Sequence, residues 1–264
     1  MHLSLLQYLI GTACGAVVGF SLGLVGGGGS ILAVPLIVYA VGVKDPHLAI
    51  GTSALAVAVN AGLNLFAHAR GGTVKWRIAG VFAPAGVVGA WLGSLGGKAL
   101  DGQKLLALFA ILMFLVGAWV LRSRSAAHAA VTPLDGRKLL RLLMAGGLTG
   151  VVCGFFGIGG GFLIVPGLMQ AACLPILQAV GSSLVAVTAF GLTTALNYAR
   201  SGWVDWPLAA VLIGGGALGG LAGAHLARHL AARKGVLNRV FAVLVFGVAA
   251  YMLYRSAATP GLWW

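Results

Sequence analysis

The sequence predicts an all-α polytopic membrane protein made of two homologous halves that are inverted relative to each other in the bilayer. Hydrophobic residues make up 60% of the 264 residues and charged residues only 8%, whereas soluble domains carry about 25% charged residues. Long apolar segments follow one another along the chain, and the pattern of the first half recurs in the second. Each half is expected to begin with a helical segment that glycines break.

Six apolar segments each have about the 20 residues that a membrane-spanning helix needs. They lie at about 48–69, 78–97, 105–121, 176–199, 207–227 and 236–254. Two longer segments, 8–43 and 142–173, contain glycine runs at 26–29 and within 157–161. A glycine inside a helix costs roughly 1 kcal/mol relative to alanine. We therefore expect each long segment to be a helix, an unwound glycine-rich turn and a second short helix, as a re-entrant hairpin or as a pair of short spans.

The internal repeat defines the organisation of the chain. The stretch GGSILAVP at 28–35 corresponds to GGGFLIVP at 159–166. Between positions 49–93 and 179–223, 15 of 45 residues are identical, and repeats of this size are typical of transporters. We divide the chain into a first transmembrane repeat at 1–126, a polar linker at 127–137 and a second transmembrane repeat at 138–264.

The basic residues favour inverted repeats, because Lys and Arg are concentrated in cytoplasmic loops. If each broken segment returns to the face where it started, the 17 Lys and Arg divide 12 to 5 between the two faces; if it crosses once, they divide 10 to 7. The uneven division places the 70–77 loop, the 122–141 region and the 228–239 loop in the cytoplasm. Both termini are then periplasmic, and we expect a multi-pass protein of a bacterial inner membrane.

The polar residues argue against enzymatic and metal chemistry. All four acids lie in loops or at the ends of spans, where they cannot serve as buried acid/base groups or cation relays. They are Asp45, Asp101, Asp135 and Asp205. The three cysteines and six histidines lack the spacing of a metal site. We expect no enzymatic activity, no metal and no cofactor.

The glycine runs are the best candidates for a binding site. Unwound backbone at membrane depth is tolerated only where it is buried in protein or lines a cavity. A helix that restarts there offers free N–H groups and a partial positive charge to an anion. Hydroxyls nearby would cap helices or donate to the anion, and a buried amide would join helices or line the cavity. The candidate substrate-binding residues are Gly27, Gly28, Gly29, Ser30, Thr52, Ser53, Asn60, Gly159, Gly160, Gly161, Ser182 and Ser183.

Close helix packing is the alternative for the glycine runs. It is the favoured interpretation for four further glycines at repeat-equivalent positions, Gly89, Gly93, Gly219 and Gly223.

The repeated motifs resemble the sulfite exporter TauE/SafE family of permeases. The first half carries Gly-Gly-Gly-x-Ile-Leu-x-Val-Pro followed by Ala-Ile-Gly-Thr-Ser. The second half carries Ile-Gly-Gly-Gly-Phe-Leu-Ile-Val-Pro followed by Ala-Val-Gly-Ser-Ser. The resemblance covers about residues 8 to 255. It implies an inner-membrane carrier of small sulfur-containing anions, such as sulfite or organosulfonates, and fixes neither the substrate nor the direction of transport.

The sequence therefore predicts a secondary transporter that binds such an anion near the midplane, at the helix N-termini of the two breaks, and moves it by alternating access. An anion channel with the same site and a carrier of a different small organic anion are the alternatives. The expected partners are the anionic substrate and the lipid bilayer. A homodimer is left open, and the basic excess, which sets orientation, does not predict binding to nucleic acid.

Overall fold

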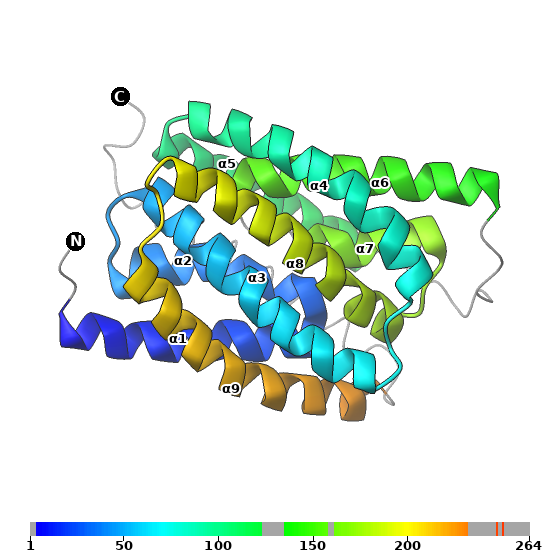
Figure 1. Cartoon of the computed structure of the whole chain (residues 1–264), viewed down its shortest axis with the longest axis horizontal. Helices are drawn as coiled ribbons and strands as arrows, with labels where there is room; N and C mark the ends of the chain where they lie inside the picture. Colours follow the sequence, from blue (N-terminus) through cyan, green and yellow to red (C-terminus); the bar gives the residue numbers. More distant parts are fainter. Residues whose placement is uncertain (1–3, 123–134, 158–160, 232–246, 248–249, 251–264) are drawn as a thin grey trace.

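The computed structural model describes residues 4–122, 135–157 and 161–231, together with Gly247 and Ala250. Every secondary-structure element of these residues is helical (Figure 1). The elements are α1 (Leu5–Val25), the 3-10 helix η1 (Gly26–Leu32), α2 (Ala33–Pro35), the π-helix η2 (Leu36–Val41), α3 (Pro46–Arg70), α4 (Trp76–Ala99), α5 (Gly102–Arg122), α6 (Gly136–Phe156), α7 (Gly161–Ala172), α8 (Ile176–Arg200) and α9 (Trp206–Ala231).

Six of these helices, α1, α3, α4, α6, α8 and α9, are long and apolar enough to cross a membrane. The prediction of an all-α polytopic membrane protein is thereby confirmed. The predicted spans agree with α3, α4, α5, α8 and α9 to within a few residues. The predicted span at 236–254 and most of the linker lie outside the described residues, so the division of the chain at 127–137 stays a prediction.

The first glycine run forms a tight helix, where the sequence analysis expected an unwound turn. The α-helix breaks at Gly26, whose φ of 66° and ψ of −141° suit a residue without a side chain. Gly26 and the three glycines after it form the first part of η1. Side chains three residues apart eclipse each other in a 3-10 helix, so a run of glycines forms one without crowding. In the second half α6 ends at Gly157, which has a φ of 65°.

The two halves exchange helices, because α1 packs along α9 and α6 packs along α4. These pairs are equivalent, since α6 repeats α1 and α9 repeats α4. A Cβ added to Gly19 of α1 would collide with the backbone of Gly216, and one added to Gly150 of α6 would collide with the equivalent Gly86. The predicted packing role of the four further glycines is also confirmed. A Cβ at each would collide with a backbone oxygen of the paired helix: Gly89, Gly93, Gly219 and Gly223.

The equivalent helices α3 and α8 lie side by side and run in opposite directions (Figure 1). Gly51 near the start of α3 lies against the backbone of Trp203, just beyond the end of α8. Gly181 near the start of α8 lies against Thr73, just beyond the end of α3. Inverted repeats require this antiparallel arrangement, whereas the orientation of the helices in a bilayer stays a prediction.

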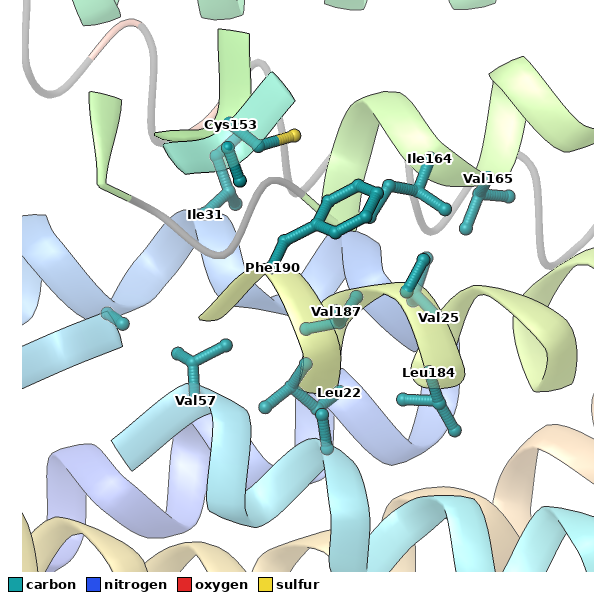
Figure 2. Packing of buried hydrophobic residues seen from close by; sticks show 14 of the residues in the cluster. Leu22, Val25, Ile31, Val57, Cys153, Ile164, Val165, Leu184, Val187 and Phe190 are labelled. Atoms are coloured by element: carbon teal, nitrogen blue, oxygen red, sulfur yellow. The ribbon is translucent and has the colours of Figure 1, made fainter. Parts of the chain in front are cut away.

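Apolar side chains from both halves fill the centre of the bundle. Figure 2 shows Leu22, Val57, Ile164, Val187 and Phe190 among the residues of this cluster. They come from α1, α3, α7 and α8, so both broken segments pack against the central helix pair. Val57 and Val187 occupy equivalent repeat positions one helical turn beyond Ser53 and Ser183. The buried Val57 and Val187 side chains therefore lie between Ser53 and Ser183 along the α3–α8 pair.

Candidate functional site

Hydroxyl groups near the starts of α3 and α8 bond to the opposite half. Thr52 Oγ1 accepts a hydrogen bond of 2.9 Å from the backbone N–H of Asp205. Ser182 Oγ accepts one of 2.8 Å from the backbone N–H of Lys75. The two bonds are repeat-equivalent, and both hydroxyl-bearing residues are fully buried. Each hydroxyl fixes the residue that precedes a helix of the other half, α9 in one case and α4 in the other.

The second hydroxyl of each pair lies near a break. Ser183 Oγ accepts a 3.1 Å hydrogen bond from the backbone N–H of Gly27 and donates one of 2.8 Å to Val180 O. In an uninterrupted α-helix that N–H would bond to the carbonyl four residues earlier. In the other half, Ser53 Oγ donates to Ile50 O at 2.8 Å, and a Cβ at Gly157 would collide with the Ile50 side chain.

The two breaks are far apart along the central helix pair. Gly62 of α3 lies against Thr188 of α8, nine residues from Ser53 and five residues from Ser183. Because the helices are antiparallel, these intervals add up to roughly 20 Å at 1.5 Å per residue. One small anion therefore cannot contact both serines in this conformation.

The structure describes all the candidates of the first glycine run but only one of the second. Gly28 and Gly29 lie in η1, and Ser30 Oγ donates a 2.8 Å hydrogen bond to Gly27 O within the same short helix. Gly161 is the first residue of α7. Gly159 and Gly160 lie outside the described residues.

Two asparagines of α3 place amide groups between α1, α3 and α9. Asn60 Nδ2 donates to Leu212 O at 3.3 Å, and Asn64 Nδ2 donates to Asn60 O at 2.9 Å. Both side chains are buried, and the Oδ1 atom of each has no hydrogen-bond partner among the described residues. An unsatisfied buried acceptor costs about 1–3 kcal/mol. These oxygens therefore mark a place where water or a donor group of a ligand would be stabilised.

His68 completes this polar face and was missed by the sequence analysis. Its Nε2 lies 3.1 Å from Gly23 O of α1, and its Nδ1 lies 3.1 Å from Thr73 Oγ1. The side chain is only 3% exposed. The signal was present in the sequence, because positions 60, 64 and 68 share one face of a helix. Only the structure shows that this face packs against the end of α1, where His68 contacts Gly23 O.

A second polar cluster joins α4 and α8 near the opposite end of the central pair. Lys98 Nζ donates to Asn197 Oδ1 at 2.7 Å and to Ser201 Oγ at 3.1 Å, and Asn197 Nδ2 donates to Ser94 Oγ. The described hydrogen-bond acceptors of the Lys98 ammonium group are neutral oxygen atoms. Its positive charge is therefore held without an acidic partner in this cluster, which favours anions over cations nearby.

The acidic residues act at helix N-termini. Each of the four aspartates accepts hydrogen bonds from backbone N–H groups at the start of α3, α5, α6 or α9. No group of three or more His, Cys, Asp or Glu within the described residues could hold a metal ion. Within the described spans, no buried carboxylate would therefore repel an anion.

The sequence of nearly the whole chain matches one protein family. The family model described as "Sulfite exporter TauE/SafE" matches residues 11–252. The chain belongs to the TauE/SafE family. It is 53% identical over 256 residues to a "Probable membrane transporter protein" of Xylella fastidiosa strain 9a5c, covering 96% of this chain and 98% of the relative. It is 26% identical over 273 residues to the "Probable membrane transporter protein YunE" of Bacillus subtilis, covering 95% and 99%.

No solved structure matches the chain. The family and its relatives make this protein a multi-pass membrane transporter. Within this TauE/SafE member, the described polar groups near the two ends of the α3–α8 pair include His68 with Asn64 and Lys98 with Asn197.

Proposed function

We propose that this TauE/SafE protein is a secondary transporter of a small sulfur-containing anion, sulfite or an organosulfonate, in a bacterial inner membrane. The observation that carries the proposal is the reciprocal packing of two repeats around the antiparallel pair α3–α8, with a broken helical segment beside each end. Inverted repeats with discontinuous helices are the architecture of alternating-access carriers. The description of the family as sulfite exporters supports the substrate class.

In this proposal each break is a half-site that binds the anion when it faces water. At the first break the anion would replace the Ser183 hydroxyl as the acceptor of the Gly27 N–H. Backbone N–H groups at a helix start stabilise negative charge. Ser183 would then turn its hydroxyl toward the anion, at the expense of its bond to Val180 O. The repeat-equivalent groups around Ser53 and the 159–161 glycines would form the other half-site.

The apolar centre would keep the two half-sites from being open together. Val57, Val187 and Phe190 are fully buried between them. Movement of one repeat relative to the other would carry the anion past this layer, as alternating access requires. A channel would instead need the layer to open on both sides at once.

The test is a flux measurement with the purified protein in liposomes. Sulfite, sulfate, thiosulfate, taurine and sulfoacetate would be offered in turn, with protein-free liposomes as the control. The proposal predicts saturable uptake of at least one sulfur-containing anion, accelerated by the same anion trapped inside. Non-saturating flux without counter-transport would favour the channel. Uptake of none of these compounds would overturn the proposed substrate class.

A further inference from the structure

Tyr198 carries a buried hydroxyl group that the proposed half-sites do not use. The residue lies near the end of α8, and its side chain is fully buried. Its Oη atom has no hydrogen-bond partner among the described residues. A buried polar group without a partner destabilises a folded protein, and phenylalanine would fill nearly the same space without that cost. The hydroxyl group is therefore a donor that a bound polar molecule would satisfy.

His47 contributes an unpaired acceptor to the same aromatic cluster. Its ring, near the start of α3, stacks on the Trp203 ring with centroids 4.7 Å apart, and the Tyr198 centroid lies 6.2 Å from that of His47. His47 Nε2 lies 3.1 Å from Leu100 O, which can only accept, so Nε2 carries a hydrogen. Nδ1 of the neutral ring is then an acceptor. This buried atom also lacks a partner among the described residues.

One small molecule can satisfy both atoms. The two rings are close enough for a single guest to accept from Tyr198 Oη and to donate to His47 Nδ1. Both atoms are shut off from solvent in this conformation, so the guest would enter when this end of the molecule opens to water. Such a guest has to carry an acceptor and a donor.

Lys98 brings a positive charge to this junction of α3, α4 and α8. Leu100, whose backbone oxygen His47 contacts, follows Lys98 by two residues at the end of α4. The Lys98 ammonium group donates to Asn197 Oδ1 at 2.7 Å and to Asn197 O at 3.3 Å, and Asn197 directly precedes Tyr198 in α8. Both acceptors are neutral oxygen atoms. A positive charge at this place favours a guest that is an anion.

The acidic residues at this end of the molecule are bonded to backbone groups. Asp45, Asp101 and Asp205 each accept a hydrogen bond from a backbone N–H at the start of α3, α5 or α9. The positive end of a helix dipole offsets a carboxylate charge there. The described acceptors of Lys98 include none of these carboxylates, so its charge stays available to an anion.

This junction lies beside the second break. A Cβ added to Gly97, in the last turn of α4, would collide with Phe155 O near the end of α6. A Cβ added to Gly157, where α6 ends, would collide with the Ile50 side chain, about one helical turn beyond His47. A guest at the junction would therefore lie next to the half-site proposed at this break.

We propose that this junction binds a small organosulfonate that also carries a donor group such as a hydroxyl. The sulfonate oxygens accept from the Tyr198 hydroxyl, the hydroxyl of the guest donates to His47 Nδ1, and the Lys98 ammonium group stabilises the negative charge. The proposal rests on the proposed function, because it narrows the substrate class of that carrier. Tyr198 and His47 then both gain the partners that they lack in this conformation.

The experiment compares isethionate with ethanesulfonate, which differ only in the terminal hydroxyl group. Uptake of each into proteoliposomes gives KM and kcat, and the wild-type protein should show a several-fold lower KM for isethionate. His47→Phe keeps a ring on Trp203 but removes the acceptor, so it should lose this preference. Tyr198→Phe should raise the KM of both probes about tenfold. Its Tm in detergent should be unchanged or higher, because it removes an unsatisfied polar group. A purely structural role of Tyr198 would leave both KM values unchanged.

Lys98→Met should raise the KM of both probes, and Lys98→Arg should largely restore it. Matched controls are Lys104→Met, at an exposed lysine of α5, and Tyr8→Phe, at a half-buried tyrosine of α1. Both should behave as the wild type. His47→Phe decides the matter if Tyr198→Phe does not fold. Equal KM values for the two probes in the wild type, or an unchanged KM in Tyr198→Phe or Lys98→Met, would overturn the proposal. Saturable uptake of sulfite but of neither probe would overturn it while leaving the transporter function intact.

Discussion

At the scale of single residues, hydroxyl groups bridge the two halves. The sequence analysis found Thr52, Ser53, Ser182 and Ser183 from their position after a glycine at the start of an apolar helix, and left capping and anion binding open. The structure gives each of them a protein partner. Three of them, Thr52, Ser182 and Ser183, accept a hydrogen bond from a residue more than 100 positions away in the chain, and local spacing cannot predict such contacts. Anion binding by these hydroxyls stays a proposal.

Removing the Ser183 hydroxyl should destabilise the first break. In Ser183→Ala the Gly27 N–H loses its acceptor in a buried place, which should cost about 1–3 kcal/mol. Ser183→Thr retains the hydroxyl and should cost less. Thermal unfolding in detergent measures both. Thr188→Ala is the control, because among the described residues the Thr188 hydroxyl bonds to Leu184 O of its own helix, α8. An equal loss in Ser183→Ala and Thr188→Ala would contradict the bridging role.

The repeat-equivalent substitutions Thr52→Ala and Ser182→Ala should have similar effects. Each removes one hydrogen bond between the halves, so each should lower the free energy of unfolding by about 1 kcal/mol. The two residues lie at equivalent places, and the same unfolding assay should therefore give nearly equal shifts. A large effect of one substitution and none of the other would indicate that the two contacts are not equivalent.

At the scale of helices, glycines decide which elements pack together. The spacing of Gly89 with Gly93 and of Gly219 with Gly223 predicted close packing, but the partners α6 and α1 belong to the opposite half. Partner choice depends on the shape of both surfaces, which periodicity in one segment does not contain. The form of the first break was missed for a similar reason. Four glycines predicted an unwound turn, yet packing of η1 against α1, α7 and α8 holds them in a tight helix.

Glycine-to-alanine substitutions at close-packed and at open positions of the same helices separate the stability effect of helix packing from that of helix propensity. Gly89→Ala on α4 and Gly219→Ala on α9 would push a methyl group into a backbone oxygen, and should cost about 1–3 kcal/mol. Gly80→Ala and Gly214→Ala are matched controls on those helices, since no atom lies within 4 Å of an added Cβ. The controls should gain up to about 1 kcal/mol from helix propensity. Thermal unfolding in detergent distinguishes the pairs, and equal behaviour of all four variants would refute the close packing.

At the scale of the whole molecule, the sequence predicted most of the architecture. Apolar segments about 20 residues long and a repeat with 15 identities in 45 positions were enough to locate the spanning helices and their equivalence. The sequence did not predict that the halves exchange helices or that the two breaks lie roughly 20 Å apart. Both features depend on how the repeats pack, and the sequence alone therefore predicts a single shared site near the midplane.

The directions of the packed helices agree with the basic residues. Because α3 and α8 are antiparallel, Arg70, Lys75 and Arg77 at the end of α3 lie at the end of the molecule where α8 begins. Arg137, Lys138 and Arg141 at the start of α6 lie at this end as well, since α6 runs parallel to α4. At the opposite end are Lys44, Lys98 and Arg200. The more basic end is the one expected in the cytoplasm.

The central claim is that the two halves are inverted in the membrane, and accessibility at two equivalent positions tests it most directly. Gly71 and Ser201 follow α3 and α8 at the same repeat position, both are exposed, and neither has a positive φ. Each would be changed to cysteine in a background where Cys14, Cys153 and Cys173 are replaced by alanine. A membrane-impermeant maleimide applied to intact cells should label Ser201→Cys and should reach Gly71→Cys only after permeabilisation. Labelling of both positions from the same side would contradict the inverted arrangement and the transport mechanism built on it.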